Sequence, residues 1–447
     1  MGCCASAHQA LEALEPVFRP IRRLGRGTFA DVWLCEAVHS GEKVAVKLIK
    51  RGFDDFQAQH ISYEIQLQSL VASPHVVGLK QLLLTRAHLG LVLEYVPSGT
   101  LDRYCKAHPP DEEMARYLLR QMVVCVSFLH GMQVVHRDLK LQNILVAQTE
   151  SGLPRLKLID FGCAKRWKRR TGKSSQFHTA YMGTPAYMSP QLLQAGLRGS
   201  GNYDGVKVDV WCLGVMLVQM FASCHVPYSM DDYKYEQAMG EHFGVLERLR
   251  DMERGKWKDT NPTIAAAAAG MSAPLLDLLD RIFDPMESTR INLPGIQAHP
   301  WVAAPLPERY EAALGFMVEE EKSYPTQPKM IVDPVKGAAC APDAATGRYD
   351  LVDDIVRMAA RGRYVPKLEG GSGGLMVYNI SGLGTNLDIS VTGPGEAGAD
   401  KETEAGTVPA VGSMTQGQCV EAVARTDPST HGGSHFHVLV GGAENRV

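Results

Sequence analysis

The stretch VVHRDLKLQNILV at residues 134–146, with LKLIDFGCAK at residues 156–165, decides the fold and the chemistry expected of this chain. Asp138 precedes Asn143 by five residues, and Asp160 follows Asp138 by 22 residues. Transfer of a phosphoryl group needs little covalent help from a protein. It needs a carboxylate at the acceptor hydroxyl, oxygen ligands for Mg²⁺ and cations on the phosphates. These three residues match the first two needs.

Each side chain can be given a role from its chemistry. Asp138 is predicted to orient and deprotonate the acceptor hydroxyl, and Asn143 with Asp160 is predicted to bind Mg²⁺. Lys47 and Lys140 are predicted to neutralise the phosphates. HRDLKxxN followed by DFG at this distance is a highly specific pattern, and it predicts phosphoryl transfer.

A second, weaker pattern lies nearer the N-terminus. In LGRGTFADV, residues 24–32, Gly25 and Gly27 stand in a strand-turn-strand pattern, where backbone amides can approach a polyphosphate. VAVK ends at Lys47, and Glu64 follows 17 residues later in a predicted helix, where it can pair with that lysine. Taken singly, such glycines form ordinary turns, and such a lysine or glutamate is usually solvated.

Composition limits the class of protein. The 447 residues are 45% hydrophobic and 21% charged, with a net charge of -3, which predicts no general attraction to nucleic acid. Ten cysteines show no paired CxxC spacing, which favours a reducing compartment. The most apolar run, residues 210–224, is shorter than the roughly 18–20 residues that span a bilayer. It predicts a buried core helix.

Periodicity and composition divide the chain into five parts. Residues 1–17 are expected to be an acylated N-terminal segment and residues 18–302 one folded domain, with strands first and helices later. Residues 303–350 are expected to be a linker. Residues 351–368 can form an amphipathic helix, or a transient helix without a partner. Residues 369–447 are low in complexity and are expected to be disordered.

The motifs together resemble the protein kinase family over roughly residues 21–302. Further similarity lies in GTPAYMSPQLL at 183–193, in the YDGVKVDVWCLGVML segment with Asp209, and in STRINLPGIQAHPW at 288–301. The resemblance implies an α+β, bilobal fold. Its small lobe would be built on a five-stranded antiparallel sheet and its large lobe would be mainly helical, with ATP bound between them.

The resemblance also implies the site residues. Lys140, two residues after Asp138, is similar to the lysine of serine/threonine kinases, and Thr184 resembles the threonine that fixes the catalytic aspartate in that group. Protein substrates with Ser or Thr acceptors are therefore expected. The implied catalytic residues are Asp138, Lys140, Asn143 and Thr184, and the implied ATP-binding residues are Leu24, Gly25, Arg26, Gly27, Val32, Ala45, Lys47, Glu64, Glu94, Val96, Leu145 and Asp160.

Within the family, the chain looks most like the calcium/calmodulin-dependent kinase group and the sucrose-non-fermenting-related kinases of plants and green algae. The similar segments are HVVGLKQLLLTRAHLGLVLEYVPSGTL, YDGxxxDVW and HPW followed by LPE. The chain has no DxDxDG loop with a glutamate at position 12, so no built-in calcium-binding hand is expected.

Two departures from the family pattern leave alternatives open. Ala30 replaces the third glycine of the loop, and Gln191 stands where a glutamate usually pairs with the arginine that matches Arg290. Gln191 can still accept a hydrogen bond from Arg290, without the charge-assisted part. A catalytically weak pseudokinase and a membrane-bound scaffold are the alternatives to an active enzyme.

The segment between Gly162 and Gly183 is basic, with six Lys or Arg residues. Because Arg137 precedes the predicted catalytic aspartate, phosphorylation here is expected to neutralise and order the local positive charge. A solvated basic loop is the alternative. The predicted sites are Ser174, Ser175 and Thr179.

The N-terminal MGCCAS satisfies the M-G-x-x-x-[ST] pattern, with Gly2 exposed after removal of methionine and Ser6 in place. One myristoyl chain binds membranes only marginally, and no Lys or Arg lies between residues 5 and 18. We therefore expect myristate on Gly2 and palmitate on Cys3 or Cys4, against an unmodified start as the alternative. We therefore expect the protein at the cytoplasmic face of a membrane, with the plasma membrane as the first candidate, and a second pool in the cytoplasm.

Overall fold

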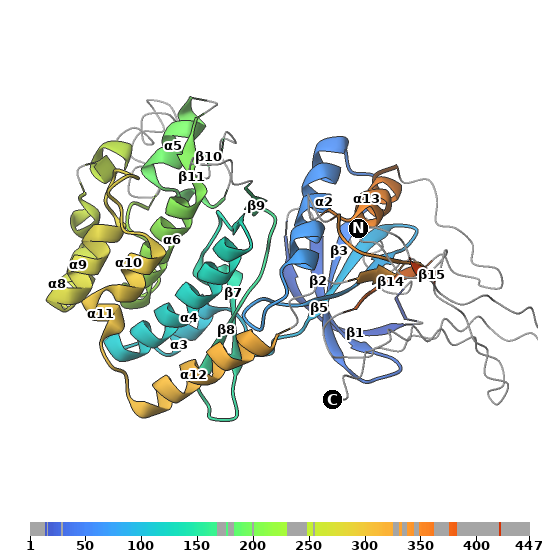
Figure 1. Ribbon diagram of the computed structural model, residues 1–447, viewed down its shortest axis with the longest axis horizontal. Coiled ribbons are helices and arrows are strands. Elements are labelled where there is room, and N and C mark those ends of the chain that lie inside the picture. The colour runs from blue at the N-terminus through green and yellow to red at the C-terminus, as the bar shows by residue number, and fades with distance from the viewer. Residues whose placement is uncertain are drawn as a thin grey trace, which may run out of the picture. The chain divides into compact units, whose positions relative to one another are not determined.

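The computed structural model divides into two compact units (Figure 1). Unit 1 comprises residues 1–72, 78–95 and 325–447, and unit 2 comprises residues 73–77 and 96–324. The structure describes residues 14–15, 17–27, 30–167, 176–177, 183–198, 201–229, 248–253, 255–324, 330–332, 338–343, 348–361, 375–381 and 420–421.

Unit 1 is built on an antiparallel sheet covered by helix α2 (Asp55–Leu70). Five of its strands pair in the order β1-β2-β3-β5-β4, which confirms the predicted small antiparallel sheet. These strands are β1 (Phe18–Arg26), β2 (Ala30–Ala37), β3 (Lys43–Lys50), β4 (Leu79–Leu84) and β5 (His88–Glu94). Both faces of the sheet are buried: Ile49 and Leu89 belong to the apolar cluster that includes Ile65 of α2, and Val44 and Phe18 to the cluster on the other side.

The sheet is wider than the sequence predicts. In the described part of the chain it has nine strands, because four strands from beyond residue 325 continue it past β4. The added strands, in sheet order, are β14 (Met376–Ser381), β12 (Met330–Val332), β13 (Ala338–Cys340) and β15 (Val420–Glu421). The prediction of a disordered tail over 369–447 is therefore wrong for β14 and β15, and the prediction of a plain linker over 303–350 is wrong for β12 and β13.

Strand β14 pairs with the edge of β4 in antiparallel register, Met376 opposite Leu84 and Asn379 opposite Gln81. The Gln81 side chain, which is buried, donates a hydrogen bond of 2.7 Å to Asn379 Oδ1. An unpaired edge strand exposes a row of backbone donors and acceptors, and MVYNIS has the β-branched and aromatic residues that suit such an edge. The tail segment therefore closes an edge that the five strands alone would leave open.

Helix α13 (Asp350–Arg361) packs on α2 within unit 1. Its Leu351, Val352, Ile355 and Val356 are buried in the same cluster as Ile65 of α2. The alternative of a helix without a partner is therefore wrong. The described helix covers Asp350–Arg361, and the rest of the predicted helix, residues 362–368, lies outside the described residues. A polar contact accompanies the apolar one, because Asp353 Oδ1 accepts hydrogen bonds from Ser62 and, at 2.8 Å, from Gln66.

Replacing Asp353 by alanine is expected to lower the free energy of unfolding of unit 1. Ser62 and Gln66 are buried, so the change would leave two buried donors without their acceptor, at a cost of about 1–3 kcal/mol. Thermal unfolding of the full chain measures the loss. Asp354→Ala is the matched control, because Asp354 is 59% exposed and its ion pair among the described residues is with its helix neighbour Arg357. Equal shifts in the two variants would contradict the role given to Asp353.

Unit 2 is mainly helical, as predicted for the large lobe. Its centre is α6 (Gly205–Phe221), in which every residue from Val208 to Met220 is buried, confirming the predicted core helix. No helix in the described part of the chain is both long and apolar enough to cross a membrane. Further helices of unit 2 in the described part of the chain are α3 (Leu101–Ala107), α4 (Glu112–Gly131), α5 (Pro190–Leu197), α8 (Pro262–Ala269), α9 (Ala273–Ile282), α10 (Leu293–Ala298), α11 (Pro300–Ala303) and α12 (Glu308–Ser323), and residues 248–253 are helical as well.

Helix α12 falls within the segment 303–350, so the linker prediction is wrong here as well. The helix packs on α4: the ring of Tyr310 stacks on Tyr117 with centroids 4.7 Å apart, and Arg120 donates to Glu311 at 2.8 Å. The hydrophobic pattern of α12 is weak, because Tyr310 and Met317 are its only buried residues. This explains why the sequence did not reveal it.

Candidate active site

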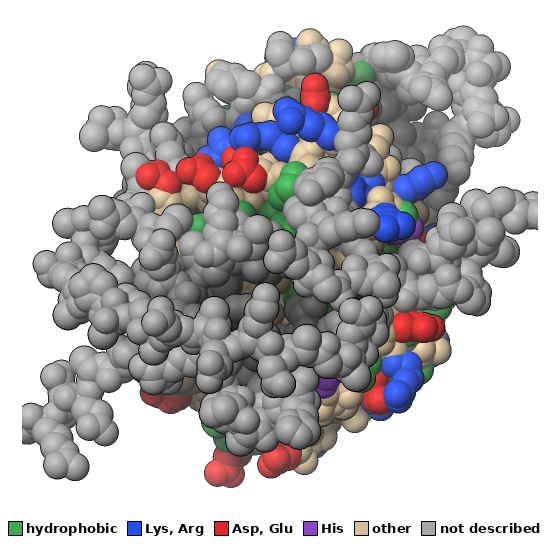
Figure 2. Space-filling model, turned by 90° about the vertical axis from the view of Figure 1, so that its right-hand side faces the viewer, with side chains coloured by type: hydrophobic (Ala, Val, Ile, Leu, Met, Phe, Trp, Pro, Cys, Tyr) green, Lys and Arg blue, Asp and Glu red, His purple; other side chains and the backbone are tan. Residues whose placement is uncertain are grey.

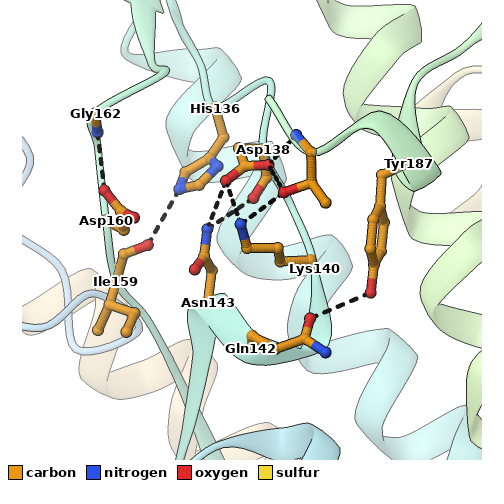
Figure 3. Close-up of polar contacts among 10 residues, drawn as sticks. His136, Asp138, Lys140, Gln142, Asn143, Ile159, Asp160, Gly162 and Tyr187 are labelled. Atoms are coloured by element: carbon orange, nitrogen blue, oxygen red, sulfur yellow. Dashed lines mark hydrogen bonds and ion pairs between the residues drawn. The ribbon is translucent and has the colours of Figure 1, made fainter. Parts of the chain in front are cut away.

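A loop in unit 2 brings the predicted catalytic residues together (Figure 3). It runs from β6 (Val134–Val135) into the short 3₁₀-helix η1 (Leu141–Asn143) and on to β7 (Ile144–Gln148). Strand β7 pairs with β8 (Pro154–Leu158), and β6 pairs with β9 (Lys165–Arg166) on the far side of DFG. Two short strand pairs therefore hold the loop and the DFG segment in one region of the unit.

The Asp138 carboxylate accepts hydrogen bonds from three other site residues. Thr184 donates to Oδ1 through both its backbone N–H and its hydroxyl, each at 2.7 Å. Lys140 Nζ donates to Oδ2 at 2.7 Å and also to the Thr184 hydroxyl at 2.7 Å, while Asn143 Nδ2 reaches Oδ2 at 3.1 Å. Since charge-assisted hydrogen bonds are the stronger ones, this arrangement holds an ionised Asp138 in a defined orientation.

A buried aspartate on α6 fixes the backbone of this loop. Asp209 is fully buried and accepts hydrogen bonds from the backbone N–H groups of Arg137 at 2.7 Å and His136 at 3.0 Å. Arg137 has a φ of 63°, which L-residues rarely adopt. Such strain persists only where neighbouring groups enforce it, and here the Asp209 carboxylate does so.

Gly183 is a site residue that sequence reasoning did not single out. Its φ is 100°, and a Cβ added there would lie 2.6 Å from the Arg137 carbonyl oxygen, closer than real Cβ contacts allow. Only glycine lets the chain pass this close to the catalytic loop and place Thr184 against Asp138. The available signal was the position of Gly183 directly before Thr184 in GTPAY.

Asp160 also has a strained backbone, with a φ of 67°. Its Oδ1 accepts a hydrogen bond from Gly162 N at 3.1 Å, and the preceding residue, Ile159, donates from its backbone N–H to the Asn143 carbonyl at 2.9 Å. The DFG turn is therefore tied directly to the loop that carries Asn143. His136 Nε2 lies 3.3 Å from the Ile159 carbonyl oxygen, a contact drawn as a dashed line in Figure 3.

Cys163, next to the DFG glycine, lies in an environment that disfavours the thiolate. Burial, followed by the negative charges of Asp138 and Asp160, raises the pKa of the thiol to about 11. Because the thiolate is the reactive form, Cys163 is not suited to act as a nucleophile at neutral pH.

The predicted ion pair forms in unit 1. Lys47 on β3 and Glu64 on α2 are joined by a contact of 2.5 Å between Nζ and Oε1, and the Glu64 side chain is only 10% exposed. Helix α2 begins with a capping box, in which Asp54 accepts from Gln57 N and Gln57 Oε1 accepts from Asp54 N. This stable start sets the register that turns Glu64 towards the sheet.

The glycine segment also lies in unit 1, at the end of β1. A Cβ added at Gly25 would meet no atom within 4 Å, so packing within the fold does not require glycine there. Gly27 N donates to Ala30 O at 2.8 Å, which places Ala30 at the start of β2. The open backbone at Gly25 fits the approach of a phosphate group.

The remaining nucleotide candidates divide between the two units. Val32 lies opposite Lys47, and Glu94, at the end of β5, lies opposite Val44 and accepts from Gly78 N at 3.2 Å. The unit 1 candidates are Leu24, Gly25, Arg26, Gly27, Val32, Ala45, Lys47, Glu64 and Glu94, and those of unit 2 are Val96, Leu145 and Asp160. The predicted residues Gly2, Cys3, Cys4, Ser174, Ser175 and Thr179 lie outside the described residues.

Gln191, which replaces the glutamate usual at this position, still binds Arg290 in unit 2. Gln191 Oε1 accepts a hydrogen bond of 2.9 Å from Arg290, as predicted, and its amide nitrogen donates to the Pro285 carbonyl. Arg290 is 1% exposed, and burial lowers the pKa of its guanidinium to about 10. It also lies over the Trp211 ring, with Cζ 4.9 Å from the centroid. The arginine therefore keeps a dense set of partners without a carboxylate at position 191.

Comparison with known proteins gives a consistent result. The sequence model of the protein kinase domain matches residues 18–302. Serine/threonine-protein kinase SAPK9 of Oryza sativa subsp. japonica is 30% identical over 354 residues, covering 76% of this chain and 88% of that protein. Serine/threonine-protein kinase SRK2I of Arabidopsis thaliana is 31% identical over 357 residues, covering 75% and 88%. Both alignments are longer than the range 18–302, so the similarity is not confined to it.

The family match agrees with the contents of the two units, a sheet with a Lys47–Glu64 pair in one and a helical unit with the Asp138 loop in the other. The chain belongs to the protein kinase family and is a serine/threonine protein kinase related to the SAPK and SRK2 kinases of plants.

Proposed function

We propose that this kinase transfers the γ-phosphoryl group of Mg²⁺-ATP to Ser or Thr hydroxyls of proteins, with Asp138 as the residue that orients and deprotonates the acceptor. The observation that carries the proposal is the Asp138 carboxylate itself, held by Thr184, Lys140 and Asn143 at 2.7–3.1 Å. A carboxylate fixed in this way offers a defined direction for a hydroxyl proton. Lys140 bridges Asp138 and Thr184, and from there its charge can also act on the transferred phosphoryl group.

The oxygen donors of Asn143 and Asp160 fit a divalent cation. Amide and carboxylate oxygens are the hard ligands that Mg²⁺ prefers. Asn143 uses its amide nitrogen to bind Asp138, so its carbonyl oxygen would serve the cation, together with the Asp160 carboxylate. Mg²⁺ would neutralise charge on the phosphates during transfer. Binding the cation is thus proposed as the shared task of these two residues.

In unit 1 we assign Lys47 to the α- and β-phosphates and Glu64 to the placement of Lys47. Support comes from the 2.5 Å contact and from the burial of Glu64. A lysine on a flexible stem is a poorly defined point charge, and an ion pair with a buried helix residue gives it one position.

Transfer from γ-labelled ATP to a generic basic protein tests this function directly. We expect label on Ser and Thr when Mg²⁺ is present, and loss of transfer when the cation is chelated. Protein that is folded, binds ATP and transfers nothing in either condition would favour the scaffold alternative.

We further propose that the kinase acts in signalling from the cytoplasmic face of a membrane, held by myristate on Gly2 and palmitate on Cys3 or Cys4. The motif MGCCAS supports this. A length also bears on the proposal: Leu14 is fully buried in the apolar cluster of unit 1, and only twelve residues separate it from Gly2 in sequence. Twelve residues reach at most about 40 Å, which would concentrate the enzyme on substrates beside the bilayer.

Replacing Gly2 by alanine is expected to move the kinase from the membrane fraction of cells to the soluble fraction, because it removes the acceptor of the first acyl chain. Fractionation with mass spectrometry of the N-terminal peptide measures both location and acylation. Ala7→Gly, outside the motif, is the control and should fractionate as the parent does. Membrane association of Gly2→Ala equal to that of the parent would refute the tether.

A further inference from the structure

Strand β1 of unit 1 carries a group of exposed arginines. Arg19, Arg22, Arg23 and Arg26 are all exposed, and Ile21 between them is 47% exposed. Strand β1 is also the edge of the sheet, since it pairs only with β2 among the described strands. In the space-filling view, the described Lys and Arg side chains gather in separate groups, some of them beside Asp and Glu (Figure 2). The ion pairs of the β1 arginines show how much of their positive charge is neutralised by acidic neighbours.

Two of the four arginines have acidic partners. Arg19 lies 3.4 Å from Glu36 and Arg26 lies 3.8 Å from Asp31, in pairs whose arginine side chains are 71% and 61% exposed. Arg22 and Arg23 form no ion pair with any residue that the structure describes. The middle of β1, Ile21-Arg22-Arg23, is therefore an exposed apolar side chain followed by two arginines that have no acidic partner within the described part of the chain.

This group lies close in sequence to the proposed acyl chains. Val17 N and Phe18 N both donate to the Leu14 carbonyl, at 2.8 and 2.7 Å, which anchors the start of β1 to the buried Leu14. Twelve residues separate Gly2 from Leu14, a length of at most about 40 Å. An acyl chain on Gly2 would thus hold β1 near the headgroups, where attraction between charges becomes effective within a Debye length of about 8 Å.

We propose that Ile21, Arg22 and Arg23 form a contact surface for the anionic headgroups of a lipid bilayer, which turns the edge β1 of unit 1 towards the membrane. The inference rests on the proposed tether. A membrane fits this surface better than a nucleic acid does, because the surface is a short isolated group on a chain of net charge -3. Two basic side chains are too few for binding alone, but they act as the added electrostatic signal beside an acyl chain.

The test compares binding to vesicles of mixed phosphatidylcholine and phosphatidylserine with binding to phosphatidylcholine alone. The full chain is myristoylated enzymatically, so that the surface is tested whether or not cells acylate it. Each basic side chain contributes about five-fold, so Arg22→Gln with Arg23→Gln should weaken binding to the mixed vesicles by about 25-fold. Binding to the neutral vesicles should be unchanged, and thermal unfolding checks the fold.

The matched control is Arg357→Gln with Arg361→Gln, two exposed arginines on α13 of the same unit. This pair removes the same charge from another surface and should reduce binding much less. Equal losses in the two double variants, or no loss in Arg22→Gln with Arg23→Gln, would overturn the assignment of this surface. Failure of the tether itself would appear instead as absence of myristate on Gly2 in cells, with the vesicle result unaffected.

Discussion

Replacing Asp138 by asparagine is expected to lower kcat by about 10²–10⁴-fold, the usual contribution of a positioned general base. The asparagine amide cannot take the hydroxyl proton. In one orientation, the amide N–H groups replace Oδ2, which now accepts hydrogen bonds from Lys140 at 2.7 Å and from Asn143 at 3.1 Å. In the other orientation, the N–H groups replace Oδ1, and the two hydrogen bonds from Thr184 are lost. The variant therefore loses both the base and part of the orientation of the loop.

The measurement is single-turnover phosphoryl transfer with saturating Mg²⁺-ATP, since this isolates the chemical step from product release. Asp280→Asn is the control: Asp280 is a half-exposed aspartate of α9 in unit 2, bound to Lys258 and Trp257. It should retain the rate of the parent. A rate within a few-fold of the parent for Asp138→Asn would show that another group deprotonates the acceptor.

Replacing Lys47 by methionine is expected to lower kcat/KM for ATP by about 10²–10³-fold, as loss of one preorganised charge typically does. The Lys47 ammonium is the group that we assign to the phosphates, and methionine keeps the apolar stem on β3 without the charge. The change also removes the 2.5 Å contact that Lys47 makes with the Glu64 carboxylate. Because the Glu64 side chain is only 10% exposed, losing this cation is costly, and thermal stability should fall.

Lys50→Met is the matched control, because Lys50 is an exposed residue at the end of the same strand. Steady-state kinetics with varied ATP should separate the two variants. Glu64→Gln adds a second check: it keeps a hydrogen-bond acceptor near Lys47 but removes the charge, so its effect should be smaller than that of Lys47→Met. A Lys47→Met enzyme with the parent's kcat/KM would contradict the assignment of this lysine.

Much of the site could be predicted from the sequence because its chemistry is local. Asp138, Lys140 and Asn143 lie within six residues of one another, on a single loop, so their spacing determines their proximity. The Lys47–Glu64 pair was predictable for a related reason. It needs only a strand followed by an adjoining helix, and each element has a clear pattern of its own.

The residues that hold the site in place from distant parts of the chain were harder to predict from the sequence. Gly183 is required by the Arg137 carbonyl, which is 46 residues away in sequence, and nothing in the composition near Gly183 indicates that contact. The tail was misjudged for the same reason. Its glycine- and alanine-rich composition predicts disorder, whereas a short segment such as β14 gains its order from the open edge of β4.

The sequence by itself determined the family, the reaction and the identity of the central side chains, because phosphoryl transfer imposes residue types at short, fixed spacings. Only the tertiary structure decided that the chain beyond residue 325 belongs to the sheet unit, with α13 on α2 and β14 on β4. Arg51, for example, donates at 2.7 Å to the carbonyl of Met358, more than 300 residues further on. An amphipathic helix shows in sequence that it needs a partner, but complementary surfaces and unpaired backbone groups elsewhere in the chain select which partner it finds.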